Sequence, residues 1–302
     1  MVSYSNKYIT WAAAIVERVV ATIGDFYPEH TILGRRTVLP AQPIEPNSHP
    51  KLLADKARVR KFQSAVGQLM YIMLATQPDL AYPVGMLARH VSNPSPAHED
   101  ALIHLAGYLS HTKQICLVYR KSPANQTPGL MEAYTDADWA GEEHSARSTS
   151  GMVILKNDSA ICWGSKRQGI VSRSTMESEY IALYTTANHL DLMIKLEQQL
   201  RLTVYIPTIW CDNKAAIAIA TGSVMDFKRT RFMNIKYHWV RKAYEGQYFY
   251  VEYVKSENNL ADMFTKRLAP NSLRFLRDLF LENYDKKDEL EEYEASGDEE
   301  DV

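Results

Sequence analysis

The sequence predicts an α/β protein: a mixed β-sheet flanked by helices, preceded by a mainly helical segment and followed by a disordered acidic tail. Between Ala57 and Thr112 apolar residues recur three and four positions apart, which is the spacing of one helix face. From Met131 onward short apolar runs alternate with longer helical patterns, as in a sheet covered by helices. Residues 282–302 hold eleven acidic residues and two lysines, too few apolar groups to offset the entropy cost of ordering.

Charge is distributed unevenly along the chain. The whole chain has a formal net charge of -2 and residues 282–302 account for -9, so residues 1–281 carry +7. Such a basic body predicts a polyanionic partner. With 46 % hydrophobic and 23 % charged residues, the composition excludes a collagen-like, coiled-coil or wholly disordered chain.

Signals for export or membrane insertion are not expected. The most apolar stretch, 11–23, is interrupted by Glu17 and Arg18, so no segment of membrane-spanning length and apolarity is predicted. The first residues lack the basic start and apolar core of a signal peptide. The three cysteines form no C-x-x-C pair, which argues against a disulfide framework or a zinc site. We therefore expect no membrane partner and an intracellular location, cytoplasmic or nuclear.

The first part of the chain predicts helices. The apolar pattern indicates one helix over 7–23, an irregular connector with five prolines over 28–50, and two or three helices over 57–112. Ser95 followed by Pro96 predicts an N-cap and a proline at the first helical position. We divide this part into a poorly defined segment, 1–57, and a helical segment, 58–125.

The second part predicts the mixed sheet, as a domain over 130–268 with a helical extension over 269–281. The expected strands are 131–135, 151–155, 160–163, 204–211 and 248–254. The expected helices are 175–200, 215–220, 235–244 and one from 260 onward.

Carboxylates at strand ends and helix starts are the candidates for chemistry. Phosphodiester hydrolysis by two Mg²⁺ ions needs such a cluster, because Mg²⁺ prefers oxygen ligands and two ions stabilise the attacking and leaving oxygens. The candidates are Asp136 and Asp138 after the first strand, Glu177 and Glu179 at the start of the long helix, Asp212 at a strand end, and Asp262 in the first turn of the last helix.

Structural alternatives exist for the aspartates. Asp136 and Asp138 are two residues apart on one strand face, so their spacing does not choose between them, and either could serve a turn. Asp212 could start the turn before the next helix. Asp262 could complement the dipole of a helix that begins after Asn258 or Asn259.

The two glutamates are easier to separate. Ser174 and Glu177 fit a capping box, with Ser174 as N-cap and Glu177 reaching back to its backbone N–H. Glu177 then has a structural role, which leaves Glu179, on another face of the helix, for chemistry.

Several motifs occur in a fixed order. They read YTDADWAG at 134–141, RSTSG at 147–151, WGSKRQ at 163–168, STMESEYIAL at 174–183, CDNKAAI at 211–217, YHWVR at 237–241 and NLADMFTK at 259–266. Together they resemble the ribonuclease H region of copia-type retrotransposon Pol polyproteins. Upstream, AVGQLMY at 65–71 and QPDLAY at 77–82 resemble the connection between polymerase and nuclease. The resemblance covers about residues 58–268.

This resemblance implies a ribonuclease H-like fold and a set of site residues. It implies that Asp136, Glu179, Asp212 and Asp262 are the catalytic residues and the ligands of two Mg²⁺ ions, with Mn²⁺ as a substitute. It selects Asp136 over Asp138. The reaction it implies is endonucleolytic hydrolysis of the RNA strand of an RNA–DNA hybrid, leaving a 3′-hydroxyl and a 5′-phosphate.

The sequence departs from the family pattern in three places. The loop 255–259 has no histidine where many ribonucleases H place one, and we expect His238 to have a structural role on a helix. Residues 229–234 read RTRFMN, where copia relatives usually read RTKHID. No adjacent aspartate pair exists, so no polymerase activity is expected. The alternative is an inactive retrotransposon remnant that only binds nucleic acid or a polymerase partner.

Basic and hydroxyl side chains provide the expected contacts to the hybrid. Lysine and arginine neutralise phosphates without regard to sequence, and hydroxyl groups can contact the 2′-hydroxyls of RNA in the minor groove. A second expected partner is a reverse transcriptase polymerase part. The expected nucleic-acid-binding residues are Lys166, Arg167, Ser172, Arg173, Ser174, Thr175, Arg229 and Arg231.

Overall fold

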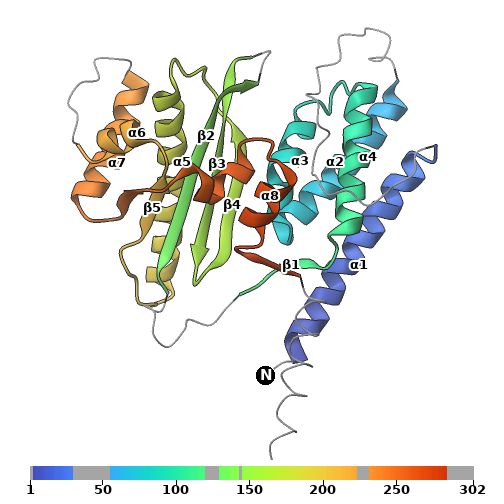
Figure 1. The fold of residues 1–302 in the computed structure, drawn as a ribbon, viewed down its shortest axis with the longest axis horizontal. Coiled ribbons are helices and arrows are strands. Elements are labelled where there is room, and N and C mark those ends of the chain that lie inside the picture. Colours follow the sequence, from blue (N-terminus) through green and yellow to red (C-terminus); the bar gives the residue numbers. More distant parts are fainter. Residues whose placement is uncertain (1–2, 30–54, 120–128, 143–144, 223–230, 284–302) are drawn as a thin grey trace, which may run out of the picture. The chain divides into compact units, whose positions relative to one another are not determined.

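The computed structural model describes residues 3–29, 55–119, 129–142, 145–222 and 231–283 (Figure 1). Within two helices, the side chains of residues 3–12 and 231–237 lie outside this description. The chain divides into a first unit, Met1–Val118 with Leu281–Val302, and a second unit, Tyr119–Phe280. Each unit is described by itself. No helix in the described ranges is both long and apolar enough to cross a membrane.

The first unit is mainly helical, as the sequence predicts. Asp55 caps its second long helix by accepting hydrogen bonds from the N–H groups of Ala57 and Arg58, 3.1 and 3.0 Å away. Ser95 is an N-cap followed by Pro96 at the first turn, which confirms the sequence prediction. The elements are α1 (Ser3–Phe26), α2 (Lys56–Ala75), the 3-10 helix η2 (Pro78–Leu80), α3 (Ala81–Ala88) and α4 (Pro96–His111).

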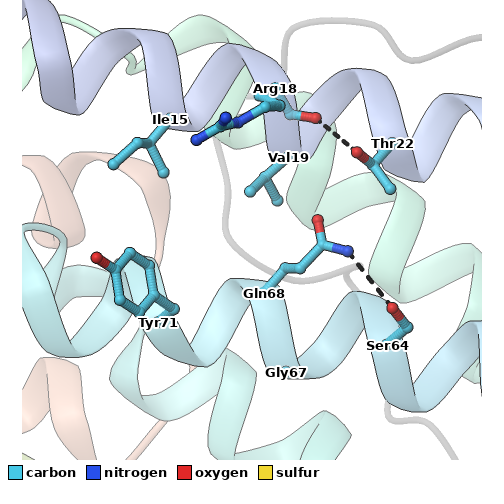
Figure 2. A pocket seen from close by; sticks show the side chains of 8 residues that line it. All are labelled: Ile15, Arg18, Val19, Thr22, Ser64, Gly67, Gln68 and Tyr71. Atoms are coloured by element: carbon cyan, nitrogen blue, oxygen red, sulfur yellow. Dashed lines mark hydrogen bonds between the residues drawn. The ribbon is translucent and has the colours of Figure 1, made fainter.

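A pocket of about 600 Å³ lies between α1 and α2 (Figure 2). Its walls include Ile15, Arg18 and Val19 from α1 and Gln68 and Tyr71 from α2. None of the expected site residues line this pocket, so it is not the candidate catalytic site.

A short strand pair closes the first unit and was not expected. β1 (Ile115–Leu117) pairs antiparallel with β7 (Leu281–Asn283). Glu282 and Asn283 therefore belong to a strand, and the expected tail boundary at residue 282 is two residues too early. Three-residue strands are too short to produce a readable pattern, and this pair forms because Ile115 and Leu281 are buried. Residues 284–302 lie outside the described part of the chain.

The second unit contains the expected mixed sheet. Its strands are β2 (Met131–Glu142), β3 (Arg147–Lys156), β4 (Ser159–Arg167), β5 (Thr208–Cys211) and β6 (Tyr250–Tyr253). Their order is β4-β3-β2-β5-β6, with antiparallel pairs from β4 to β2 and parallel pairs from β2 to β6. This order and the flanking helices agree with the helix-flanked mixed sheet that the sequence predicts.

All five strands differ in their bounds from the prediction; β3 and β4 are longer than expected and β6 is shorter. β2 does not end at Thr135 but continues to Glu142, because Asp136 and Asp138 stay paired with β3. β5 begins only at Thr208, four residues later than expected. The polar run after Thr135 suggested a strand end, whereas pairing with a neighbouring strand keeps this segment extended.

One face of the sheet forms the main core. Ala133, Ile209 and Val251 lie side by side on β2, β5 and β6 and are almost completely buried. Against this face pack α5 (Thr175–Gln199), α6 (Lys214–Ala220) and α7 (Arg231–Glu245) (Figure 1). The opposite face of β2 therefore stays available for the polar residues that alternate with the core positions.

The expected last helix is divided into two. The 3-10 helix η4 (Leu260–Phe264) is separated from α8 (Pro270–Arg277), and a further 3-10 turn, η3 (Ser256–Asn258), precedes them. Pro270 is at the start of α8, where proline is tolerated but cannot continue a preceding helix. The prediction of one continuous helix from residue 260 was wrong for this reason.

Candidate functional site

The four expected carboxylates converge on one edge of the sheet. Asp136, Asp212 and Asp262 each place a carboxylate oxygen within 4.8 Å of the other two. In a second group, Glu179, Cys211 and Asp212 likewise place one ligand atom each within 4.8 Å of the others. Asp212 belongs to both groups, so residues from β2, α5, β5 and η4 share one site. Asp136, Glu179 and Asp262 are buried and Asp212 is half-buried.

Parallel pairing of β2 and β5 explains why Asp136 and Asp212 meet. The last register pair of these strands is Thr135 with Cys211, and the next residue in the chain after each of them is an aspartate: Asp136 within β2 and Asp212 just after β5. Because the two strands run parallel and in register, both carboxylates leave the backbone at the same level of the sheet. Thr135 accepts a hydrogen bond from Thr186 of α5 at 3.0 Å, so Asp136 faces the other side of the sheet.

Asp262 is held in place through Asn259. The Asn259 side chain accepts a hydrogen bond from the N–H of Ala261 at 3.1 Å and caps η4. Its amide nitrogen donates to the Thr135 carbonyl at 3.0 Å. Asn259, rather than Asn258, is therefore the cap, and it fastens η4 to β2 one residue before Asp136.

Glu179 lies in the second turn of α5, behind a modified cap. The Ser174 hydroxyl accepts a hydrogen bond from the N–H of Glu177 at 3.2 Å, as expected. The Glu177 carboxylate, however, accepts from the N–H of Arg173 at 2.7 Å instead of that of Ser174, so the second half of the predicted capping box was wrong by one residue. Glu177 is nevertheless engaged in capping, and Glu179 points to the carboxylate site.

Two hydroxyl groups and one ammonium group contact the carboxylates and were not expected. The Thr265 hydroxyl donates to Asp136 Oδ2, and the Ser256 hydroxyl donates to Asp212 Oδ2 at 2.5 Å. The ammonium of Lys266 lies 2.8 Å from Asp262 Oδ1 and 3.9 Å from Asp136 Oδ2. A signal in the sequence that could have found Lys266 is its spacing: it follows Asp262 by four residues, about one helical turn.

Burial and mutual repulsion raise the pKa of Glu179, Asp212 and Asp262. Burial, followed by the charges of Asp136 and Asp212, raises the pKa of Glu179 to about 9. Burial and then Asp136 raise the pKa of Asp262, and the hydrogen bond and charge of Lys266 partly oppose this. The pKa of Asp212 is also raised, first by burial, against the lowering effect of Ser256. The cluster therefore holds protons at neutral pH unless another positive charge replaces them.

The chemistry of these donors fits a divalent cation. Glu179 Oε2 is buried and accepts no hydrogen bond from the residues that the structure describes, and a buried oxygen without a partner is costly. Asp136, Glu179, Asp212 and Asp262 supply hard oxygen ligands, which Mg²⁺ and Mn²⁺ prefer. Burial raises the pKa of the Cys211 thiol well above its usual value, so Cys211 remains a neutral thiol and a poor ligand.

We expect the metal-free protein to lose stability as the pH rises from about 5 to about 9. Because the pKa of Glu179 is about 9 in the folded chain and ordinarily 4.5, the folded state keeps a proton that the unfolded chain releases. The free energy of unfolding therefore decreases across this window, and the melting temperature in EDTA should fall by about 5 °C or more.

Glu179→Gln tests the source of this pH dependence. The amide cannot ionise, so the melting temperature of this variant should change much less between pH 5 and pH 9 than that of the parent. Asp191→Asn on α5 is the matched control, because Asp191 forms an ion pair with Lys195 one turn away on the same helix. Parallel curves for the parent and Glu179→Gln would exclude Glu179 as the cause.

The expected nucleic-acid-binding residues have different environments in the structure. Arg167 donates to both carboxylate oxygens of Glu142, at 2.8 and 2.9 Å, and Lys166 is exposed beside it at the end of β4. Arg173 and Thr175 are exposed at the start of α5, whereas Ser174 is its N-cap. These five residues remain predicted contacts.

Ser172 requires a correction. Its hydroxyl is buried and donates to the side chain of Gln168 at 2.8 Å. Gln168 in turn donates to Ser150 and to the carbonyl of Ser178. The Ser172 hydroxyl therefore stabilises the loop before α5 and is not available as a donor to RNA. The sequence could not reveal this, because the residues to which Gln168 donates, Ser150 and Ser178, lie on β3 and α5.

The other two expected nucleic-acid-binding residues, Arg229 and Arg231, lie largely outside the described part of the chain. Arg229 is outside it, and Arg231 begins α7 but its side chain is not described. His238 lies on α7 with an exposed side chain. It is not among the residues that converge with the carboxylates.

Comparison with known proteins gives related sequences, although no family model matches the chain. The retrovirus-related Pol polyprotein from transposon TNT 1-94 of Nicotiana tabacum is 33 % identical over 232 residues, which are 76 % of this chain and 17 % of that protein. The corresponding polyprotein from transposon RE2 of Arabidopsis thaliana is 29 % identical over 245 residues, 79 % of this chain and 16 % of that protein. The chain thus spans about one sixth of the length of these relatives.

A shorter relative and two solved structures are also similar. The secreted RxLR effector protein 161 of Plasmopara viticola is 42 % identical over 122 residues, 40 % of this chain and 83 % of that protein. LC11-RNase H1, isolated from compost, has a TM-score of 0.36 and 16 % identity, covering 45 % of this chain and 93 % of that protein. Its complex with an RNA/DNA hybrid has a TM-score of 0.34 and 15 % identity over the same shares.

Proposed function

Because this chain is a homologue of a segment of the retrovirus-related Pol polyproteins of plant transposons, we propose that it is a ribonuclease H. In this proposal it is an endonuclease that hydrolyses the RNA strand of RNA–DNA hybrids with two divalent metal ions. One observation carries the proposal: Asp136, Glu179, Asp212 and Asp262, which come from four separate elements, converge on one sheet edge. Acids that repel one another have little structural use unless they bind a cation.

Asp136, Glu179, Asp212 and Asp262 would hold the ions, with Mg²⁺ as the natural cofactor and Mn²⁺ as a substitute. Two such ions supply a polarised phosphate, an activated water and stabilisation of the leaving oxygen. The buried, unsatisfied oxygen of Glu179 supports this assignment.

The remaining residues of the site orient the carboxylates. Thr265 and Ser256 each donate one hydrogen bond, to Asp136 and Asp212 respectively, which limits rotation of these side chains. Lys266 offsets part of the negative charge beside Asp262. Such fixed orientation places the reacting groups before substrate arrives, which lowers the cost of reaching the transition state.

A noncatalytic function is the second candidate. The ammonium of Lys266 lies against both Asp262 and Asp136, so part of the cluster is already compensated without metal. This contact favours an inactive remnant that only binds nucleic acid or a polymerase partner.

Cleavage of a labelled hybrid separates the two candidates. The purified chain with Mg²⁺ should cut the RNA strand of an RNA–DNA hybrid and leave 5′-phosphate ends, and EDTA should abolish this activity. Duplex DNA and duplex RNA serve as substrate controls. Asp212→Asn should lower the rate by about 10³-fold, whereas Asp191→Asn on α5 should leave it unchanged. Binding of the hybrid without any cleavage would select the noncatalytic candidate.

A further inference from the structure

An exposed lysine lies over a tyrosine ring close to the carboxylate site. Lys214 is the first residue of α6, and its ammonium lies 4.9 Å from the ring centre of Tyr253 at the end of β6. The Tyr253 side chain is 44 % exposed, and Lys214 is also exposed. The pair is thus accessible to a large ligand.

Both members of this pair are attached to the backbone that holds Asp212. Lys214 follows Asp212 by two residues, and Tyr253 is the register partner of Cys211. The N–H of Val254, next to Tyr253, donates to the Cys211 carbonyl at 3.0 Å. A few residues further, Ser256 donates to the Asp212 carboxylate. Lys214 and Tyr253 are therefore carried by the same backbone segments that position Asp212.

Local stability does not explain a lysine at this position. A cation in the first turn of a helix opposes the helix dipole. Within the described ranges, no carboxylate forms an ion pair with Lys214, whereas Lys255 and Lys266 nearby have Glu257 and Asp262 as partners. Contact with an aromatic ring limits the rotation of an ammonium and leaves its N–H groups able to donate elsewhere.

We propose that Lys214, held by Tyr253, binds a backbone phosphate of the nucleic acid next to the cleavage site. A flexible lysine acts on phosphate as a point charge, and the ring reduces the freedom that binding would otherwise remove. Lys214 is thus a substrate-binding residue and Tyr253 a positioning residue. The inference rests on the proposed function for the identity of the ligand, an RNA–DNA hybrid.

The test measures binding without catalysis. The full chain is titrated with a fluorescently labelled hybrid in EDTA at several salt concentrations, and the logarithm of the binding constant is plotted against that of the salt concentration. The binding constant falls with salt, so this slope is negative. Loss of one phosphate contact makes it less steep by about 0.7 to 0.9. We expect Lys214→Met to show this change and to bind about fivefold more weakly at about 0.1 M salt, while Lys214→Arg keeps the parental slope.

Tyr253 and a distant lysine provide the controls. Tyr253→Leu, which removes the ring, should weaken binding while keeping the slope, and Tyr253→Phe should bind like the parent. Lys195→Met removes an exposed lysine that is paired with Asp191 on α5, and its slope should equal that of the parent. Melting temperatures of all variants establish that they are folded.

The outcomes distinguish this inference from the proposed function. If Lys214→Met has the same slope as the parent and Lys195→Met, the phosphate contact is rejected, even if the parent cleaves the hybrid. If the parent does not bind the hybrid, the phosphate contact is rejected as well. If the slope becomes less steep as expected but the parent with Mg²⁺ cleaves nothing, the contact stands and the catalytic proposal fails.

Discussion

Asp136→Asn is expected to reduce the rate of hybrid cleavage by about 10³-fold or more. Asp136 is buried on β2, lies with Asp212 and Asp262 in one group of carboxylate oxygens, and accepts a hydrogen bond from Thr265. The asparagine has nearly the same size but lacks the negative charge that a divalent cation needs. The variant should therefore fold like the parent but cleave the hybrid much more slowly. Single-turnover cleavage with saturating enzyme measures this rate.

Asp138→Asn is the matched control, because the sequence alone could not choose between these two aspartates. The Asp138 carboxylate lies directly over Gly141, where a Cβ would collide with its Oδ2, and Asp138 is absent from the described groups of converging ligands. We expect the cleavage rate of Asp138→Asn to stay within about tenfold of that of the parent. A larger loss for Asp138→Asn than for Asp136→Asn would reverse the assignment.

Gly151→Ala is expected to destabilise the second unit by about 1 to 3 kcal/mol. Gly151 lies on β3 opposite Asp136, and a Cβ there would be 2.5 Å from the Thr265 side chain, 2.8 Å from Phe264 Cβ and 2.9 Å from the carbonyl of Ala261. The last of these is backbone and cannot move aside cheaply. Chemical denaturation measures the free energy of unfolding, and the melting temperature should fall by about 2 to 4 °C for each kcal/mol.

The same substitution should also impair cleavage. η4 carries Asp262 and is followed by Thr265 and Lys266, so displacing η4 from β3 moves three groups of the site together. Gly164→Ala on β4 is the control, because the nearest atom to its Cβ would be Met152 Cε at an ordinary 3.5 Å. Equal stability and activity of Gly151→Ala and Gly164→Ala would show that η4 does not need this close approach.

Features that depend on residues close together in the sequence were predicted well. The order of elements in the sheet domain follows from local apolar periodicity, and the cap of α5 follows from Ser174 and Glu177, which are three residues apart. The division of the last helix at Pro270 was missed although proline is a local signal. The strand pair β1–β7 was missed because its partners are more than 160 residues apart.

The candidate carboxylates were selected from the sequence, because strand ends and ordered motifs are local features. The residues that contact these carboxylates could not be selected from the sequence. Thr265 meets Asp136 across 129 residues, Ser256 meets Asp212 across 44, and Asn259 meets Thr135 across 124. Ser172 likewise faces Gln168 in the interior, because exposure depends on what packs above a residue.

The sequence by itself determined the fold class, the charge of the body and four acids worth testing, since periodicity, composition and motifs are properties of neighbouring residues. Only the tertiary structure decided that these acids share one sheet edge, that Lys266 lies among them and that Lys214 stands over Tyr253. The physical reason is that burial and hydrogen bonding act between residues that only folding brings together, and these set the pKa of Glu179 and the orientation of each carboxylate.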